Sequence, residues 1–184
     1  METISFKNLR TKMRKKYLWS ESTLNCLKLR FAKSEGYDIY RFMLHLRRYE
    51  YLIQQPTTLV MKFRRLWNLR QYQKYAGKCG FVIGDGVLGD DITFYHRGNI
   101  TINPNARIGD GCKFHGSCCI GNKGEGEDQC PVLGKNVDVG YGAVIIGDVF
   151  IADNIRIGAN SVVTKSFFEP NITIAGVPAR KITL

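Results

Sequence analysis

The second half of the chain repeats with a period of six residues, and this period restricts the fold more than any other feature. Aliphatic or aromatic residues recur at every sixth position, apart from one 13-residue step. These repeat residues are Ile102, Ile108, Phe114, Ile120, Leu133, Val139, Ile145, Ile151, Ile157 and Val163. A helix repeats every 3.6 residues and an open strand every 2, so neither fits. The period predicts a short strand followed by a tight corner, with three six-residue units closing one triangular coil.

Stacked coils of this kind would bury the repeat residues inside a prism. Each repeat residue would contact its counterparts in the coils before and after it, and ladders between coils would pair the backbone groups. Gly, Asn and Asp serve the corners, where a positive φ is needed. The predicted fold class is therefore mainly β, a parallel β-helix, and the period by itself leaves the handedness open.

Three segments depart from the repeat. Residues 123–131 are polar and Gly-rich and too long for a corner, so we expect them to leave the prism as an arm. Earlier hexads, offset by two residues against Ile102, are expected at Ile83, Leu88, Phe94 and Ile100, with His96 beside the change of phase. Residues 169–182 are expected to supply a closing strand at the end of the stack.

The first part of the chain has a helical pattern and a strongly basic composition. Apolar residues recur at three- and four-residue steps in 38–54 and again after Pro56, which predicts two amphipathic helices that pack on a partner surface. Residues 1–80 hold 18 Lys or Arg against 5 Asp or Glu, whereas residues 81–184 hold 9 against 11. We therefore expect a basic α-helical extension over 1–78 and a β-helix domain over 79–184.

Two interpretations of the basic extension stay open. Its helices can dock on the rest of the protein with a solvated basic face, or they can also contact a membrane or another anionic acceptor. Specific nucleic-acid binding is not expected, because no recognised motif accompanies the charge. The six cysteines lack paired metal-ligand spacing and no secretory leader is apparent, so we expect reduced thiols, no metal site and a cytoplasmic protein that can lie at the inner face of the membrane.

Three motifs resemble a known family. The stretch 96–121, the sequence IGANSVVTK at 157–165 and the sequence AGVPAR at 175–180 are similar to hexapeptide-repeat acyltransferases. Within that family the chain most resembles serine acetyltransferases and the related O-acetyltransferases of bacterial capsule and exopolysaccharide synthesis. The resemblance covers about residues 80–184 and implies a left-handed β-helix, a homotrimer, and transfer of an acetyl group from acetyl-CoA to a hydroxyl group without a metal.

The resemblance also implies which residues act. His96 aligns with the family's catalytic base, and a neutral imidazole is suited to accept the proton of an attacking hydroxyl group. His115 follows an inward repeat residue, so it faces outward and is the second candidate, whereas His45 is expected to be a packing or surface residue. The positions that match coenzyme A contacts are Tyr141, Ala159, Thr164, Lys165 and Arg180.

Several departures from the serine acetyltransferase pattern bear on the acceptor. Tyr95 and Phe81 stand where those enzymes carry acidic residues, and Gln129 and Cys130 replace an Arg-His pair. A carboxylate that orients His96 would then have to come from Asp85, Asp90 or Asp91, if one is needed. We expect a sugar hydroxyl of a surface polysaccharide as the acceptor, with free serine as the alternative. A catalytically inactive scaffold or an anionic-polymer binder is a lower alternative.

Overall fold

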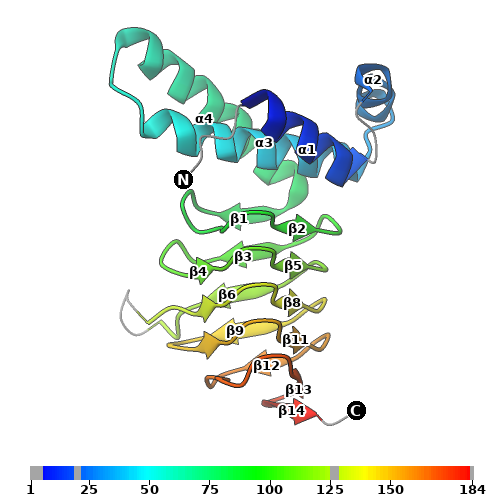
Figure 1. The fold of residues 1–184 in the computed structure, drawn as a ribbon, viewed down its shortest axis with the longest axis vertical. Helices are drawn as coiled ribbons and strands as arrows, with labels where there is room; N and C mark the ends of the chain where they lie inside the picture. The colour runs from blue at the N-terminus through cyan, green and yellow to red at the C-terminus, as the bar shows by residue number, and fades with distance from the viewer. Residues whose placement is uncertain (1–5, 19–21, 125–128, 183–184) are drawn as a thin grey trace. The chain divides into compact units, whose positions relative to one another are not determined.

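The computed structural model describes residues 6–18, 22–124 and 129–182. The chain divides into two compact units, Met1–Cys79 and Gly80–Leu184, and each is described by itself (Figure 1). The first unit is helical and the second is built from short strands. The two halves of the sequence pattern thus correspond to different kinds of structure.

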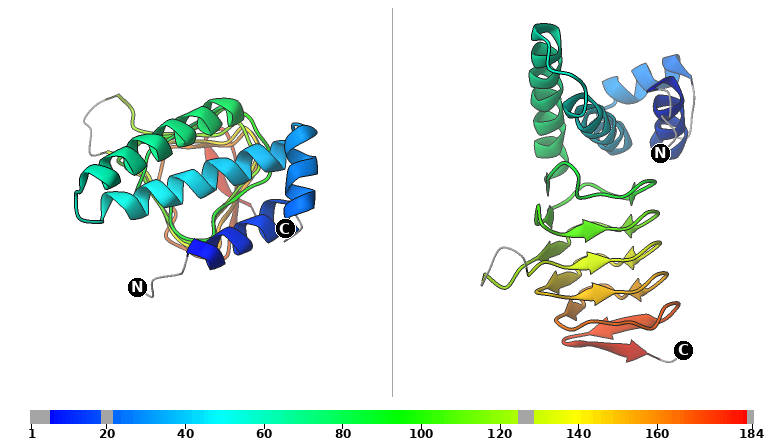
Figure 2. Two further views of the ribbon diagram at one scale, coloured as in Figure 1. Left: turned by 90° about the horizontal axis from the view of Figure 1, so that it is seen from above. Right: turned by 60° about the vertical axis from the view of Figure 1, so that its left-hand side comes forward.

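The second unit is a stack of three-sided coils (Figures 1 and 2). Sheet A has the strand order β1-β3-β6-β9-β12, sheet B β10-β7-β4 and sheet C β14-β13-β11-β8-β5-β2. The chain visits sheets A, B and C in turn, and neighbours within a sheet lie one coil apart and run parallel, except for β13 and β14. The strands are β1 (Phe81–Ile83), β2 (Thr93–Phe94), β3 (Ile100–Ile102), β4 (Arg107–Ile108), β5 (Lys113–Phe114), β6 (Cys119–Gly121), β7 (Val132–Leu133), β8 (Asp138–Val139), β9 (Val144–Ile146), β10 (Phe150–Ile151), β11 (Arg156–Ile157), β12 (Val162–Val163), β13 (Thr173–Gly176) and β14 (Ala179–Ile182).

The repeat residues form the core of this stack, as the six-residue period predicts. All ten are at most 4% exposed. They stack in register within each sheet, so that Ile120 of sheet A pairs with Ile102 in the coil before it and with Ile145 in the coil after it. Parallel β architecture with three repeat units per coil is therefore confirmed.

Four of the five glycines that directly follow repeat residues serve close approach rather than a positive φ, whereas Gly121 has open space where a Cβ would lie. Gly109, Gly134, Gly140 and Gly158 are not among the described residues with positive φ. A Cβ on Gly140 would lie 2.6 Å from the Ile157 carbonyl oxygen in the next coil, and Gly109 and Gly134 meet backbone atoms of the next coil in the same way. Since backbone atoms cannot move aside without breaking the ladder, these positions admit no side chain.

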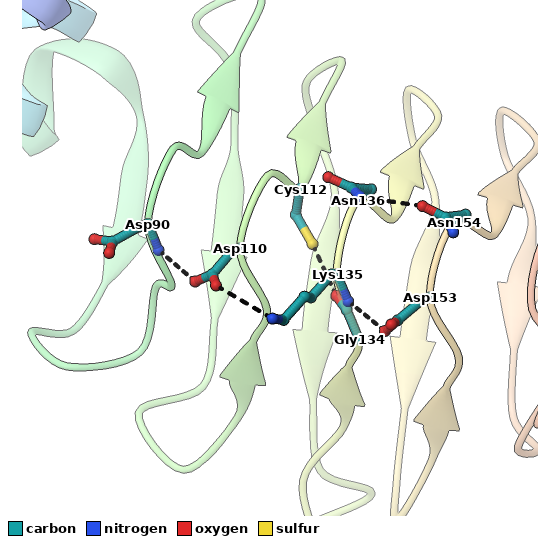
Figure 3. A network of polar contacts seen from close by, with 8 residues as sticks. All are labelled: Asp90, Asp110, Cys112, Gly134, Lys135, Asn136, Asp153 and Asn154. Carbon is teal, nitrogen blue, oxygen red and sulfur yellow. Dashed lines mark hydrogen bonds and ion pairs between the residues drawn. The ribbon is translucent and has the colours of Figure 1, made fainter. Parts of the chain in front are cut away.

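At the corner between sheets B and C, positive φ is adopted by stacked asparagines. Asn136, Asn154 and Asn171 all adopt φ between 55° and 61°. Their amides form a ladder from coil to coil, with Asn136 Nδ2 donating to Asn154 Oδ1 at 3.1 Å and Asn154 Nδ2 donating to Asn171 Oδ1 at 3.0 Å. Figure 3 shows the first of these contacts beside a second row, in which Asp110 Oδ1 accepts from the Asp90 backbone N–H at 2.9 Å. Side-chain ladders thus join successive corners.

The first coil explains the change of phase seen in the sequence. Ile83 pairs with Ile102, Leu88 bridges to Ile108 and Phe94 pairs with Phe114, so these three are the true counterparts of the later repeat. Ile100 is also buried, because β3 has three residues and points both of its ends inward. The step from Phe94 to Ile102 is therefore eight residues instead of six. The two additional residues lengthen the corner that contains His96.

The first unit consists of four helices, α1 (Phe6–Leu18), α2 (Thr23–Phe31), α3 (Glu35–Ile53) and α4 (Leu59–Cys79). The predicted apolar face of α3 is buried at Ile39, Phe42, Met43 and Leu46. Phe42 packs against Tyr72 of α4, with ring centroids 5.6 Å apart. None of the described helices is long and apolar enough to cross a bilayer.

Contrary to expectation, the apolar residues at the start of α4 do not pack on another element within the described part of the chain. Leu59, Val60, Phe63, Leu66 and Trp67 are each between 59% and 71% exposed. The face of α4 that is buried instead begins at Asn68 and continues through Tyr72, Tyr75, Ala76 and Cys79 at helical spacing. Packing against α3 selects this second face, so the first two turns of α4 keep their apolar side chains in solvent.

His45 is a buried packing residue in α3. Arg41 Nη2 lies 2.9 Å from His45 Nε2, and because a guanidinium only donates, Nε2 must be the acceptor. The proton is then on Nδ1, which donates to Asn68 Oδ1 at 3.2 Å, and the ring stacks on Tyr75. Burial lowers the pKa of His45 to about 4; the hydrogen bond that His45 donates to Asn68 acts in the opposite direction and raises it, and the charges of Arg41 and Arg48 lower it further. His45 is therefore held neutral.

We expect this neutral histidine to make the stability of the first unit pH-dependent. In the unfolded chain His45 takes up a proton near pH 6.5, whereas the folded chain takes it up only near pH 4. The contribution of neutral His45 to the free energy of unfolding is therefore fully present above pH 6.5. It is lost as the pH falls toward 4, by up to about 1.4 kcal/mol per pH unit. Urea unfolding of the parent and of His45→Gln across pH 4 to 7 measures this difference, and parallel curves for the two proteins would contradict it.

Candidate functional site

Several of the candidate site residues lie along one edge of the stack, where the chain passes from sheet C to sheet A. We call this the C–A edge. It consists of the corners at 95–99, 115–118, 140–143 and 158–161 in four successive coils. The corners are held in register by backbone bonds: the N–H groups of Tyr95, His115 and Gly140 donate to carbonyl groups of the next coil at 2.9 to 3.1 Å. His96, His115, Tyr141 and Ala159 therefore follow one another down this edge.

His115 has a carboxylate partner. Its Nε2 lies 2.8 Å from Asp138 Oδ1, and both side chains are partly exposed to solvent. The Tyr95 ring stacks on the imidazole with centroids 4.6 Å apart. When His115 is neutral, Nε2 must carry the proton that it donates to the carboxylate, so Nδ1 is left with its lone pair free to accept another proton. The arrangement is that of an imidazole oriented by an acid.

Two residues at or next to this edge are not predicted from the sequence. Asp138 precedes a repeat residue in β8, whereas His115 follows one in β5, so their contact is diagonal across the sheet and the six-residue register alone does not indicate it. Ser117 is the other, and its Oγ donates to the Tyr141 hydroxyl at 3.0 Å. The Tyr141 ring lies against Gly116, where a Cβ would be 3.0 Å from the ring, and the φ of +132° at Gly116 is one that other residues rarely adopt, so this position favours glycine.

His96 lies on the lengthened corner of the first coil and is exposed. The acids considered as its partners lie elsewhere in the same coil: Asp85 is between sheets A and B, and Asp90 and Asp91 are between sheets B and C. Phe81 is buried in the core, where its ring contacts that of Phe94 at 4.8 Å. The position to which the resemblance assigns an acid therefore holds an apolar core residue that does not reach the solvent.

The predicted coenzyme A residues lie at three places in the stack. Tyr141 and Ala159 are on the C–A edge, and Arg180 is on β14, paired with Ala175 at the end of sheet C. Thr164 and Lys165 follow β12 and lie at the corner between sheets A and B, where the Lys165 ammonium group is 5.5 Å from the centroid of the Phe167 ring. A single chain therefore does not bring all five residues together.

The arm leaves the stack at that same A–B edge, two coils before Lys165. It connects β6 to β7, and residues 125–128 of it lie outside the described residues. Cys130 at its end is buried and Gln129 is exposed. Within the described parts of the chain, no group of three or more His, Cys, Asp or Glu side chains could hold a metal ion.

No family model matches the chain. The relatives that it matches include serine acetyltransferases and a colanic acid acetyltransferase, so the predicted resemblance is confirmed. The chain is 29% identical to the serine acetyltransferase of Buchnera aphidicola subsp. Schizaphis graminum over 127 residues, which are 64% of this chain and 48% of the relative. It is 35% identical to the Synechococcus elongatus serine acetyltransferase over 96 residues, 52% of this chain and 39% of the relative.

A second kind of relative is the putative colanic acid biosynthesis acetyltransferase WcaB of Escherichia coli K12. The identity is 33% over 94 residues, which cover 51% of this chain and 57% of the relative. The chain thus spans only about half of the length of the curated relatives it matches.

Solved structures agree in fold. The soybean serine acetyltransferase complexed with serine superposes with a TM-score of 0.70 at 23% identity, over 97% of this chain and 68% of that one. The serine acetyltransferase of Brucella abortus in complex with coenzyme A gives a TM-score of 0.65 at 16% identity, over 98% and 83%. These likenesses extend over the helices as well as the stack of coils.

Proposed function

We propose that this protein is an acetyl-CoA-dependent O-acetyltransferase of the cytoplasm. The proposal rests on the similarity to acetyltransferases, together with the position of two histidines on a solvent-exposed edge of the coils. We also infer that the coils wind left-handed, as the resemblance to hexapeptide-repeat acyltransferases implies. A division into a basic helical extension and a catalytic β-helix domain near residue 79 accompanies this proposal.

The proposed reaction needs one base. His96 accepts the proton of the acceptor hydroxyl group as its oxygen attacks the thioester carbonyl carbon of acetyl-CoA. The carbon–sulfur bond then breaks, the acetyl group remains on the acceptor oxygen, and the imidazolium returns the proton to the departing thiolate of coenzyme A. The exposed, lengthened corner supports this role, because a bulky acceptor can reach a side chain that protrudes from the coil.

His115 is the second candidate for the base, and one observation favours it. Asp138 fixes its proton on Nε2 and would stabilise the imidazolium that forms when Nδ1 accepts a proton. His96 and His115 are one coil apart, and Tyr95, next to His96 in the chain, stacks on His115. An acceptor bound at this edge would therefore lie near both histidines.

The division of the coenzyme A candidates between two edges supports a trimer. Lys165 and the arm are at the A–B edge, whereas His96, Tyr141 and Ala159 are at the C–A edge. If the A–B edge of one copy lies against the C–A edge of the next, Lys165 of one chain can bind the phosphate groups of a coenzyme that contacts Tyr141 and Ala159 of its neighbour. The site then needs two copies of the chain to be complete.

We propose a sugar hydroxyl of a surface polysaccharide as the acceptor. Free serine is a zwitterion, and recognising it requires placed acidic and basic groups. Phe81 is buried and Cys130 is buried, so neither position offers such a group to a ligand. Free serine is the second candidate, and the serine acetyltransferases among the relatives favour it.

A thiol-release assay with acetyl-CoA tests the proposal. We expect release of coenzyme A in the presence of nucleotide sugars or lipid-linked oligosaccharides and much slower release with free serine. Rapid turnover on serine and none on saccharides would make the protein a serine acetyltransferase. Absence of acetyl-CoA binding by equilibrium dialysis would leave a non-catalytic scaffold and contradict the proposal as a whole.

A further inference from the structure

We infer that the start of α4 is a docking surface for an anionic lipid bilayer. The surface consists of the exposed residues Leu59, Val60, Phe63, Leu66 and Trp67, which we call the α4 stripe. It is independent of the proposed acetyl transfer, and it concerns the helical unit alone.

The α4 stripe is continuous along one side of the helix. Leu59, Phe63 and Leu66 follow one another at steps of four and three residues. Val60 and Trp67, which are seven residues apart, lie next to them on the same side of the helix. Every one of these side chains is at least 59% exposed, and Phe63, Leu66 and Trp67 also line an open hollow that continues to Arg70 and Lys74. At 1.5 Å per residue the stripe is about 12 Å long. Clustered apolar exposure of this kind marks an interaction surface.

The charges around the α4 stripe have one sign. Lys62 and Arg64 flank it on its two sides, and Arg70 and Lys74 continue the same face toward the end of the helix, all of them exposed. The sequence of α4 contains no Asp or Glu. Arg65 is different, since its guanidinium donates to the Leu52 and Gln55 carbonyl oxygens and fastens the turn before α4.

This pattern fits a bilayer better than a second copy of the chain. A two-fold contact through Phe63 would bring Lys62 and Arg64 of one copy against the same cations of the other, and like charges weaken such a contact. An anionic bilayer offers an apolar layer for the stripe and phosphate groups for the flanking cations at the same time. Tryptophan also favours the boundary between these two layers. The bilayer therefore satisfies the apolar and the charged residues together.

Trp67 makes the inference measurable in the whole protein. The chain has two tryptophans, and Trp19→Phe leaves Trp67 as the only one. We expect its emission to shift to shorter wavelength on addition of vesicles of phosphatidylcholine with phosphatidylglycerol in a 3:1 ratio, and we expect lipids brominated on their acyl chains to quench it. Vesicles of phosphatidylcholine alone, or 0.5 M salt, should reduce binding strongly.

Sedimentation with the same vesicles compares variants. Phe63→Ser with Leu66→Ser should lower the partition coefficient at least tenfold, whereas Phe31→Ser should leave it unchanged, since Phe31 is 83% exposed in α2 but lies outside the stripe. Equal partitioning of the parent and the stripe variant would overturn the inference, as would binding without a shift in Trp67 emission. If the parent protein does not bind vesicles, and the stripe variant self-associates less than the parent in sedimentation equilibrium, a second copy of the chain covers the α4 stripe. The inference is then wrong.

Discussion

Replacing His96 with Asn is expected to lower kcat for acetyl transfer by about 10² to 10⁴, with little change in the KM for acetyl-CoA. Asparagine fills a similar volume but cannot accept the proton of the attacking hydroxyl group. The side chain is exposed, so the loss should not come from unfolding, and the melting temperature is expected to stay within a few degrees of the parent value. Steady-state kinetics with the thiol-release assay measures both constants.

The same substitution at His115 discriminates between the two candidate bases. If His96 is the base, His115→Asn should retain most of the turnover, and His96→Gly should regain activity when imidazole is added, because an exposed corner is open to a small molecule. If His115→Asn and Asp138→Asn are both inactive while His96→Asn is active, the pair joined by the 2.8 Å contact performs the chemistry instead.

Replacing Phe114 with Ala is expected to destabilise the β unit by about 3 to 5 kcal/mol. Phe114 is fully buried and its ring stacks on Phe94 at 5.3 Å, which in turn contacts Phe81 at 4.8 Å. Alanine would leave a cavity in the middle of this aromatic column, and the tightly laddered coils cannot close over it. Urea unfolding followed by far-UV circular dichroism gives the loss.

Val82→Ala is the matched control for this loss. Val82 lies beside Phe81 in β1 but is 65% exposed, so its truncation should change the free energy of unfolding by no more than about 0.5 kcal/mol. Similar losses for the two variants would mean that the aromatic column does not carry the stability of the stack. Because the chain has two units, the transition of the β unit has to be resolved from that of the helices.

The repeating part of the fold is largely predictable from the sequence. A single period identifies ten core residues, and it does so because each sits at an equivalent place in a coil and meets its own counterparts. Between Phe94 and Ile102 the spacing changes, and the period no longer shows which residues are the counterparts of the later repeat residues. Two inward residues in β3 then resemble two successive repeats, and only the pairing of Ile83 with Ile102 resolves them.

The helical unit and the site are less predictable. An amphipathic pattern shows that α4 has an apolar side, but Asn68 and two tyrosines form the side that packs on α3, since tertiary contacts decide which face is buried. Asp138 and His115 are 23 positions apart, and they occupy different positions in the six-residue repeat, because His115 follows a repeat residue and Asp138 precedes one. Such diagonal contacts depend on side-chain direction, which spacing does not specify.

The arm between β6 and β7 has a consequence for how this protein can change. Its 13-residue step leaves the register untouched, because Ile120 still pairs with Ile145 and Leu133 still pairs with Ile108. The lengthened corner at His96 does the same one coil earlier. Residues that hold the prism together and residues of the proposed acceptor site are thus separate sets. The length of an arm or corner can therefore change without disturbing the ladder that holds the coils in register.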